Sequence, residues 1–118
     1  MESILSSIKK LLGPGEDLTH YDTDIMIHIN SALMTLNQLG VGPVTGLFIT
    51  GAEETWTSLI GDRKDVEGIK TYIYLKVRLI FDPPTSGFLI DAMERQIREF
   101  EWRLNVQVDK LPVEPVSE

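Results

Sequence analysis

Residues 86–104 read SGFLIDAMERQIREFEWRL, and this stretch predicts the fold class most clearly. Its apolar residues return every three or four positions, which is typical of a helix with one buried face. These residues are Leu89, Met93, Ile97, Phe100 and Leu104. On the other face, acidic residues precede basic ones by four positions, an order that stabilises a helix. The three pairs are Asp91–Arg95, Glu94–Arg98 and Glu99–Arg103. With Ser86 as the N-cap, we expect a long helix with a solvated outer face.

The same periodicity predicts helices near residues 2–12, 22–39 and 63–81, and a short helix within 53–60. Glycines and prolines in 13–15, 40–46 and 82–84 separate them. In 63–81 the stripe consists of Val66, Ile69, Ile73, Val77 and Ile80, and it is widened by Tyr72, Leu75 and Leu79. We expect this helix to be central in the bundle or shared with another subunit. The fold class is therefore all-α, a small helical bundle of about four helices with a long loop.

The last 13 residues, 106–118, contain two prolines and few apolar side chains. Such a segment cannot build a core, so we predict a helical domain over 1–105 and a flexible C-terminal tail over 106–118. Val106 and Val108 nevertheless alternate as in a strand, and Leu111 and Val113 are spaced apolar residues. The tail is either simply disordered or orders on a partner by adding a strand or entering a groove.

Composition excludes several classes of protein. The chain has 118 residues with 11 Lys and Arg against 18 Asp and Glu, and this net charge of −7 disfavours non-specific DNA binding. There is no cysteine, so no disulfide, thiolate nucleophile or Cys-ligated metal is possible. The first residues are not those of a signal peptide, and no run approaches the ~20 apolar residues of a membrane span. We expect a cytosol-like compartment and no membrane partner.

Catalytic and metal-binding patterns are missing from the sequence. His20 and His28 are eight residues apart, whereas helical ligand pairs are three or four apart. No serine lies in a nucleophile-elbow motif, and the glycine-rich turns lack the Gly-Lys-Ser/Thr ending of a phosphate loop. We predict no enzyme activity, no cofactor and no metal site.

Some apolar residues lie off the stripe of their own helix. Phe88 and Trp102 fall opposite the apolar stripe of 86–104. Ile27 and Met34 likewise face away from the stripe of 22–39, which consists of Ile25, Ile29, Ala32, Leu36 and Leu39. A loop of the same chain covers them, or they contact another subunit, as Trp and Met often do. Lys76 also falls on an apolar face. Either its aliphatic stem packs there while its ammonium reaches solvent, or the ammonium forms an ion pair with another subunit.

The segments 39–43, 70–79, 81–86, 93–97 and 101–105, in this order and at these distances, resemble the small head-tail connector (head completion or adaptor) proteins of tailed bacteriophages. The resemblance extends from Met1 to about Val108. It implies a helical bundle that assembles into a homo-oligomeric ring under the portal, with DNA passing through the hole without sequence-specific binding. It also implies a location in the virion, assembly in the host cytoplasm, and a stopper or tail-completion protein as the next neighbour.

Two functions from different classes remain open at this point. The first is a structural ring subunit whose candidate subunit or portal contacts are Ile27, Met34, Lys76, Phe88, Trp102, Val106, Val108, Leu111 and Val113. The second is a small helical regulator, without catalytic activity, that binds a protein partner through Trp102. A head-to-tail ring requires two different complementary surfaces on each subunit, and the residues off the two stripes supply candidates for both.

Overall fold

The computed structural model describes residues 3–13, 21–43, 46, 48–61 and 66–110, with the side chains of 59–60 and 107–110 left undescribed. Within these ranges the chain forms five helices and no strand. The helices are α1 (Ile4–Leu12), α2 (Asp22–Gln38), α3 (Trp56–Ile60), α4 (Val66–Phe81) and α5 (Gly87–Lys110). The predicted all-α bundle is confirmed, with α3 as the short additional helix.

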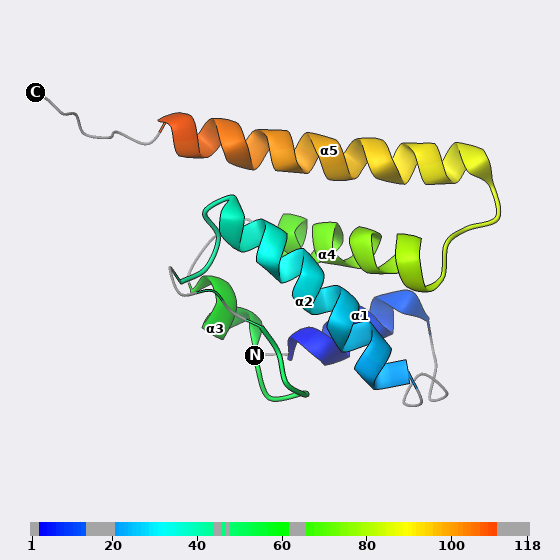
Figure 1. Cartoon of the computed structure of the whole chain (residues 1–118), viewed down its shortest axis with the longest axis horizontal. Helices are drawn as coiled ribbons and strands as arrows, with labels where there is room; N and C mark the ends of the chain where they lie inside the picture. Colours follow the sequence, from blue (N-terminus) through cyan, green and yellow to red (C-terminus); the bar gives the residue numbers. More distant parts are fainter. Residues whose placement is uncertain (1–2, 14–20, 44–45, 47, 62–65, 111–118) are drawn as a thin grey trace, which may run out of the picture.

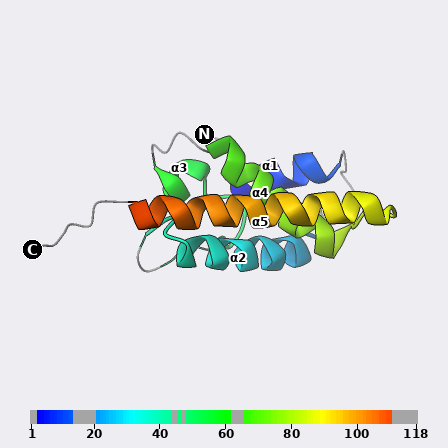
Figure 2. The same cartoon turned by 90° about the horizontal axis from the view of Figure 1, so that it is seen from above.

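Helix α4 is central, as its broad apolar surface predicted. It packs against α1, α2 and α5, and these contacts account for its buried residues on several sides. Helix α5 lies along one edge of the molecule as a separate layer (Figure 1). Seen from above, α5 runs along the middle, with α2 on one side and α1 on the other (Figure 2).

The core consists mainly of the stripes that the sequence predicted. Ile4, Ile8, Ile25, Ile29, Leu36, Ile69, Ile73 and Val77 are fully buried, and α5 contributes Met93, Ile97 and Leu104. Among the stripe residues of 63–81 and 86–104, Leu89 and Ile80 were wrongly placed in the core, since both are exposed. Leu89 belongs to the first turn of α5, and Figure 1 shows this end of α5 extending past the end of α4. Ile80 belongs to the last turn of α4, and periodicity alone cannot show where a neighbouring helix ends.

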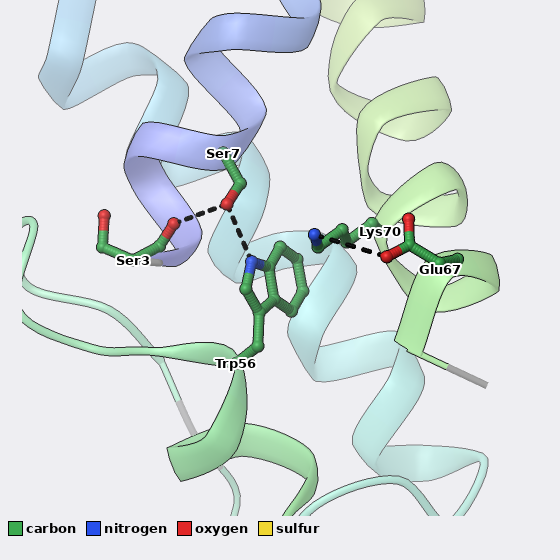
Figure 3. Close-up of polar contacts among 5 residues, drawn as sticks. All are labelled: Ser3, Ser7, Trp56, Glu67 and Lys70. Atoms are coloured by element: carbon green, nitrogen blue, oxygen red, sulfur yellow. Dashed lines mark hydrogen bonds and ion pairs between the residues drawn. The ribbon is translucent and has the colours of Figure 1, made fainter. Parts of the chain in front are cut away.

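Trp56, the first residue of α3, connects this short helix to the rest of the bundle through its side-chain contacts (Figure 3). Its ring is buried, and its indole N–H donates a 2.8 Å hydrogen bond to the hydroxyl oxygen of Ser7 on α1. The Ser7 hydroxyl in turn donates to the backbone oxygen of Ser3 at 2.8 Å. The ammonium of Lys70, on α4, lies 5.7 Å from the centre of the Trp56 ring. One side chain therefore joins α1, α3 and α4.

The last helix is longer than expected. It was expected to end at residue 104 but continues to Lys110, so residues 106–108 are helical and do not form the strand that their alternation suggested. The reason is that no residue before Pro112 breaks a helix, and Leu111 is the first position at which the following proline disfavours helical backbone. The division into a domain over 1–105 and a flexible tail over 106–118 stays a prediction. The remaining predicted tail, 111–118, lies outside the described residues.

Candidate functional site

Two asparagines hold the loop that follows α2 against the side of that helix. The side-chain amide of Asn30 donates to the Ile49 carbonyl at 3.1 Å, and its oxygen accepts the Ile49 N–H at 2.7 Å. Seven residues along the helix, Asn37 donates to the carbonyls of Val41 and Pro43 at 3.1 and 2.6 Å. Both ends of the loop are thereby fixed relative to α2.

This arrangement forms a groove of about 660 Å³ between α2 and the loop. We call it the α2 groove. It is lined by uncharged residues: Ile27, Asn30, Ser31, Met34, Asn37, Gln38, Gly46 and Phe48. Ile27, Met34 and Phe48 are 58%, 59% and 65% exposed. The loop therefore lies beside Ile27 and Met34 but leaves more than half of each side chain in solvent.

A second exposed surface lies on α5. Phe88 and Trp102 are 77% and 64% exposed, and they project opposite the buried Met93, Ile97 and Leu104. Between them on the same face are exposed charged residues, and we call the whole set the α5 outer stripe: Phe88, Asp91, Arg95, Arg98 and Trp102. Because the buried side of α5 faces α4, the outer stripe faces away from the bundle.

The charges of the α5 outer stripe are not neutralised within the described part of the chain. Of the three predicted acid–base pairs on α5, only Glu99–Arg103 forms, at 2.7 Å. The predictions of Asp91–Arg95 and Glu94–Arg98 pairs were wrong, because neither pair forms. No described residue makes an ion pair with Arg95 or Arg98. An exposed pair of this kind contributes only ~0.3 to 0.5 kcal/mol, so side-chain entropy readily outweighs it.

Lys76 has a partner within its own subunit. Its ammonium lies 3.9 Å from a carboxylate oxygen of Glu101 on α5 and 5.7 Å from the centre of the Tyr72 ring. The Tyr72 hydroxyl donates a 2.6 Å hydrogen bond to the same oxygen. Burial, together with this hydrogen bond and the negative charge of Glu101, raises the pKa of Tyr72. These contacts explain why a lysine is tolerated on the apolar face of α4. A role of Lys76 in a subunit interface stays a prediction.

The other candidate residues lie at the end of α5 and beyond it in the sequence. Val106 is half-buried on α5, the side chain of Val108 is undescribed, and Leu111 and Val113 lie outside the described residues. Sequence reasoning missed Phe48, which forms the opposite wall of the α2 groove. The seven-residue spacing of Asn30 and Asn37 was a signal, but the loop carbonyls that they bind are not visible in a sequence.

Within the described ranges, no three His, Asp or Glu side chains gather as a group that could hold a metal ion. No described helix is long and apolar enough to cross a bilayer.

Comparison with known proteins adds the family. The family model for phage connector proteins matches residues 4–111. No curated protein and no solved structure matches the chain. Because the match covers nearly the whole chain and the fold is the helical bundle that the resemblance implied, the chain belongs to the phage connector protein family, with a structural role in the head-tail connector of the virion.

Proposed function

We propose that this protein is the repeating subunit of a ring attached below the portal, where it joins the DNA-filled head to the tail. The observation that carries the proposal is the family match over residues 4–111, and two separate exposed apolar surfaces on a single small domain support it. The portal lies on one side of the ring and a stopper or tail-completion protein on the other. Assembly takes place in the host cytoplasm before the ring becomes part of the virion.

A ring requires a heterologous interface, in which one surface of a subunit meets a different surface of the next. The α2 groove and the α5 outer stripe meet this requirement because they lie on different helices and are lined by different residues. Exposed Trp, Phe and Met side chains are those that most often supply the core of such interfaces.

The DNA conduit is the second part of the proposal. Each subunit carries a net charge of −7, so a ring of many copies surrounds its channel with negative charge. A basic channel would retain the duplex, because contacts to phosphates release counterions and stabilise binding. An acidic ring lets DNA pass without sequence-specific binding.

The portal contact is assigned to the segment after α5. Leu111 and Val113 lie within residues 111–118, which follow Lys110, the last residue that the structure describes. A short extended segment with alternate apolar side chains can add to a sheet edge or enter a groove of its partner.

The experiment that tests this function combines the purified protein with portal rings. Native mass spectrometry and cryo-electron microscopy should show a closed ring of this chain on one end of each portal. The alternative, a small helical regulator, predicts a monomer or dimer at every concentration and no binding to portal. That result would overturn the proposal.

A further inference from the structure

We infer that the α5 outer stripe of one subunit docks in the α2 groove of a second copy of this chain, with the two helices parallel. Trp102 enters between Ile27 and Met34, and Arg95 lies beside Asp24. The inference rests on the proposed ring and specifies the contacts that close it.

The shape and chemistry of the α2 groove suit an indole ring. Its walls are the exposed Ile27, Met34 and Phe48, while Ser31 and Gln38 supply polar groups at its edge. Tryptophan combines a large apolar surface with one N–H donor that needs a partner when buried. Trp102 is the one tryptophan of the chain with an exposed ring, since Trp56 is buried and hydrogen-bonded to Ser7.

Charge is also complementary between the two surfaces. Helix α2 contains Asp22 and Asp24 but no Lys or Arg, and Asp22 already pairs with Lys9 at 2.7 Å. Asp24 is exposed and, within the described ranges, has no ion-pair partner, and the same is true of Arg95 and Arg98. Copies that each carry a net charge of −7 repel one another, so a local contact of opposite charge favours this pairing over others.

The spacing along the two helices fixes the direction. Trp102 and Arg95 are seven residues apart, or about 10.5 Å along a helix. Ser31, midway between Ile27 and Met34, lies seven residues from Asp24 on one side and seven from Gln38 on the other. With Trp102 opposite Ser31, parallel helices place Arg95 opposite Asp24, whereas antiparallel helices place it opposite the uncharged Gln38. The ion pair therefore selects the parallel arrangement.

A charge exchange tests the contact, with ring formation alone and on portal rings as the readout. Trp102→Ala, Arg95→Asp and Asp24→Arg should each raise the protein concentration needed for ring assembly roughly tenfold or more, as loss of an interface anchor does. The double variant Arg95→Asp with Asp24→Arg should recover assembly. The control Arg95→Asp with Glu67→Arg has the same net charge, but the compensating change is at the exposed Glu67 of α4, outside the proposed contact, and it should not recover assembly. Circular dichroism checks that every variant is folded.

Because the chain has no cysteine, the direction can be tested separately by crosslinking. Arg95→Cys protein is mixed under mild oxidation with tagged Asp24→Cys protein, or with tagged Gln38→Cys protein as the matched control. The first mixture should give the disulfide-linked heterodimer, and the second should not, since a disulfide requires Cα atoms within about 7 Å. A heterodimer only with Gln38→Cys overturns the parallel arrangement.

The remaining outcomes separate this inference from the proposed function. If the wild type forms rings, Trp102→Ala assembles equally well and the charge exchange does not restore assembly, the docking is overturned. The ring function is then still supported. If Trp102→Ala forms normal rings that no longer bind portal, Trp102 contacts the portal and not a second copy of the chain. This result also overturns the docking. Wild-type protein that forms no ring, alone or on portal, overturns the ring function itself.

Discussion

The Tyr72 hydroxyl on α4 donates a 2.6 Å hydrogen bond to a carboxylate oxygen of Glu101 on α5, and the Lys76 ammonium lies 3.9 Å from the same oxygen. Helix α5 is a separate layer that packs mainly on α4 (Figure 1). Its attachment therefore combines a narrow apolar stripe with one cluster of polar groups. Since α5 also carries Trp102, the position of this helix sets the position of the proposed docking surface.

Tyr72→Phe should weaken this attachment in a pH-dependent way. Hydrogen bonds to charged groups contribute ~1.5 to 3 kcal/mol, which is the expected loss of unfolding free energy near neutral pH. The pKa of Tyr72 is raised in the folded protein, first by burial and then by Glu101, whereas an unfolded tyrosine ionises near its ordinary value of about 10. The stability from Tyr72 is thus complete below about pH 10 and is lost as the pH rises above it.

Thermal melts of the wild type and Tyr72→Phe across the alkaline range test this expectation. The wild type should lose stability more steeply above about pH 10, so the two melting curves should converge. Tyr21 and Tyr74 are present in both proteins and cancel in the comparison. Parallel pH profiles would show that Tyr72 is not protected from ionisation in the folded state.

Phe100→Ala and Phe88→Ala should have very different effects on the unfolding free energy, although both residues lie on α5. The Phe100 ring is half-buried and stacks on Tyr72 with ring centres 5.4 Å apart. Truncating a buried Phe costs ~3 to 5 kcal/mol, and a half-buried ring should fall at or below the lower end. Phe88 is exposed, so its truncation should change the unfolding free energy by less than ~0.5 kcal/mol. Urea denaturation measures both, and equal losses would contradict the orientation of α5.

Trp56 and Ser7 should behave as a coupled pair. Ser7→Ala leaves the buried indole N–H without its acceptor, a loss of ~1 to 3 kcal/mol. Trp56→Phe removes the donor together with part of the ring. In the double variant, Ser7→Ala should add little to the cost of Trp56→Phe, because no donor remains to be satisfied. Additive losses in a double-mutant cycle would exclude a stabilising Trp56–Ser7 hydrogen bond.

How far the sequence predicted the fold depends on the feature. The apolar stripes correctly predicted the buried faces of α2 and α5, because a single period describes each helix. The buried residues are Ile25, Ile29 and Leu36 on α2 and Met93, Ile97 and Leu104 on α5. Leu89 and Ile80 follow the same periods but are exposed, because the period of a helix carries no information about the length of its neighbour. The predicted end of α5 was wrong because the two prolines and few apolar side chains of 106–118 were taken to exclude a helix from the whole segment, whereas no residue before Pro112 breaks one.

For the candidate site, the sequence identified the exposed residues on the helices but not the one in the loop. Ile27, Met34, Phe88 and Trp102 were identified by facing away from their own stripes, and all four are exposed. Phe48 was missed because it lies in a loop without periodicity, and only the hydrogen bonds of Asn30 place it beside α2. Long-range contacts of this kind follow from the fold and not from local pattern.

Asn30→Ala should release the loop and remove one wall of the α2 groove. Both hydrogen bonds to the Ile49 backbone are lost, and hydrogen exchange at the Ile49 amide should become faster. If Phe48 helps to hold Trp102 of a neighbouring copy, ring assembly should also weaken. Thr23→Ala is the control, because Thr23 is an exposed residue of α2 that does not line the groove. Faster exchange with unchanged assembly would remove Phe48 from the interface.

Deletion of residues 111–118 should separate portal binding from folding. The cut follows Lys110, so it leaves all of α5 and the half-buried Val106 in place, whereas a cut at 106 would remove helical residues. The melting temperature should therefore stay close to that of the full chain. Affinity for portal rings should fall, because the deletion removes Leu111 and Val113, the apolar residues assigned to the portal contact. Binding measured by surface plasmon resonance on immobilised portal tests this, with Leu111→Ser plus Val113→Ser as the variant that keeps the chain length. If both proteins bind portal as tightly as the full chain does, the portal contact lies elsewhere, and the outer faces of α2 and α5 become the surfaces to examine.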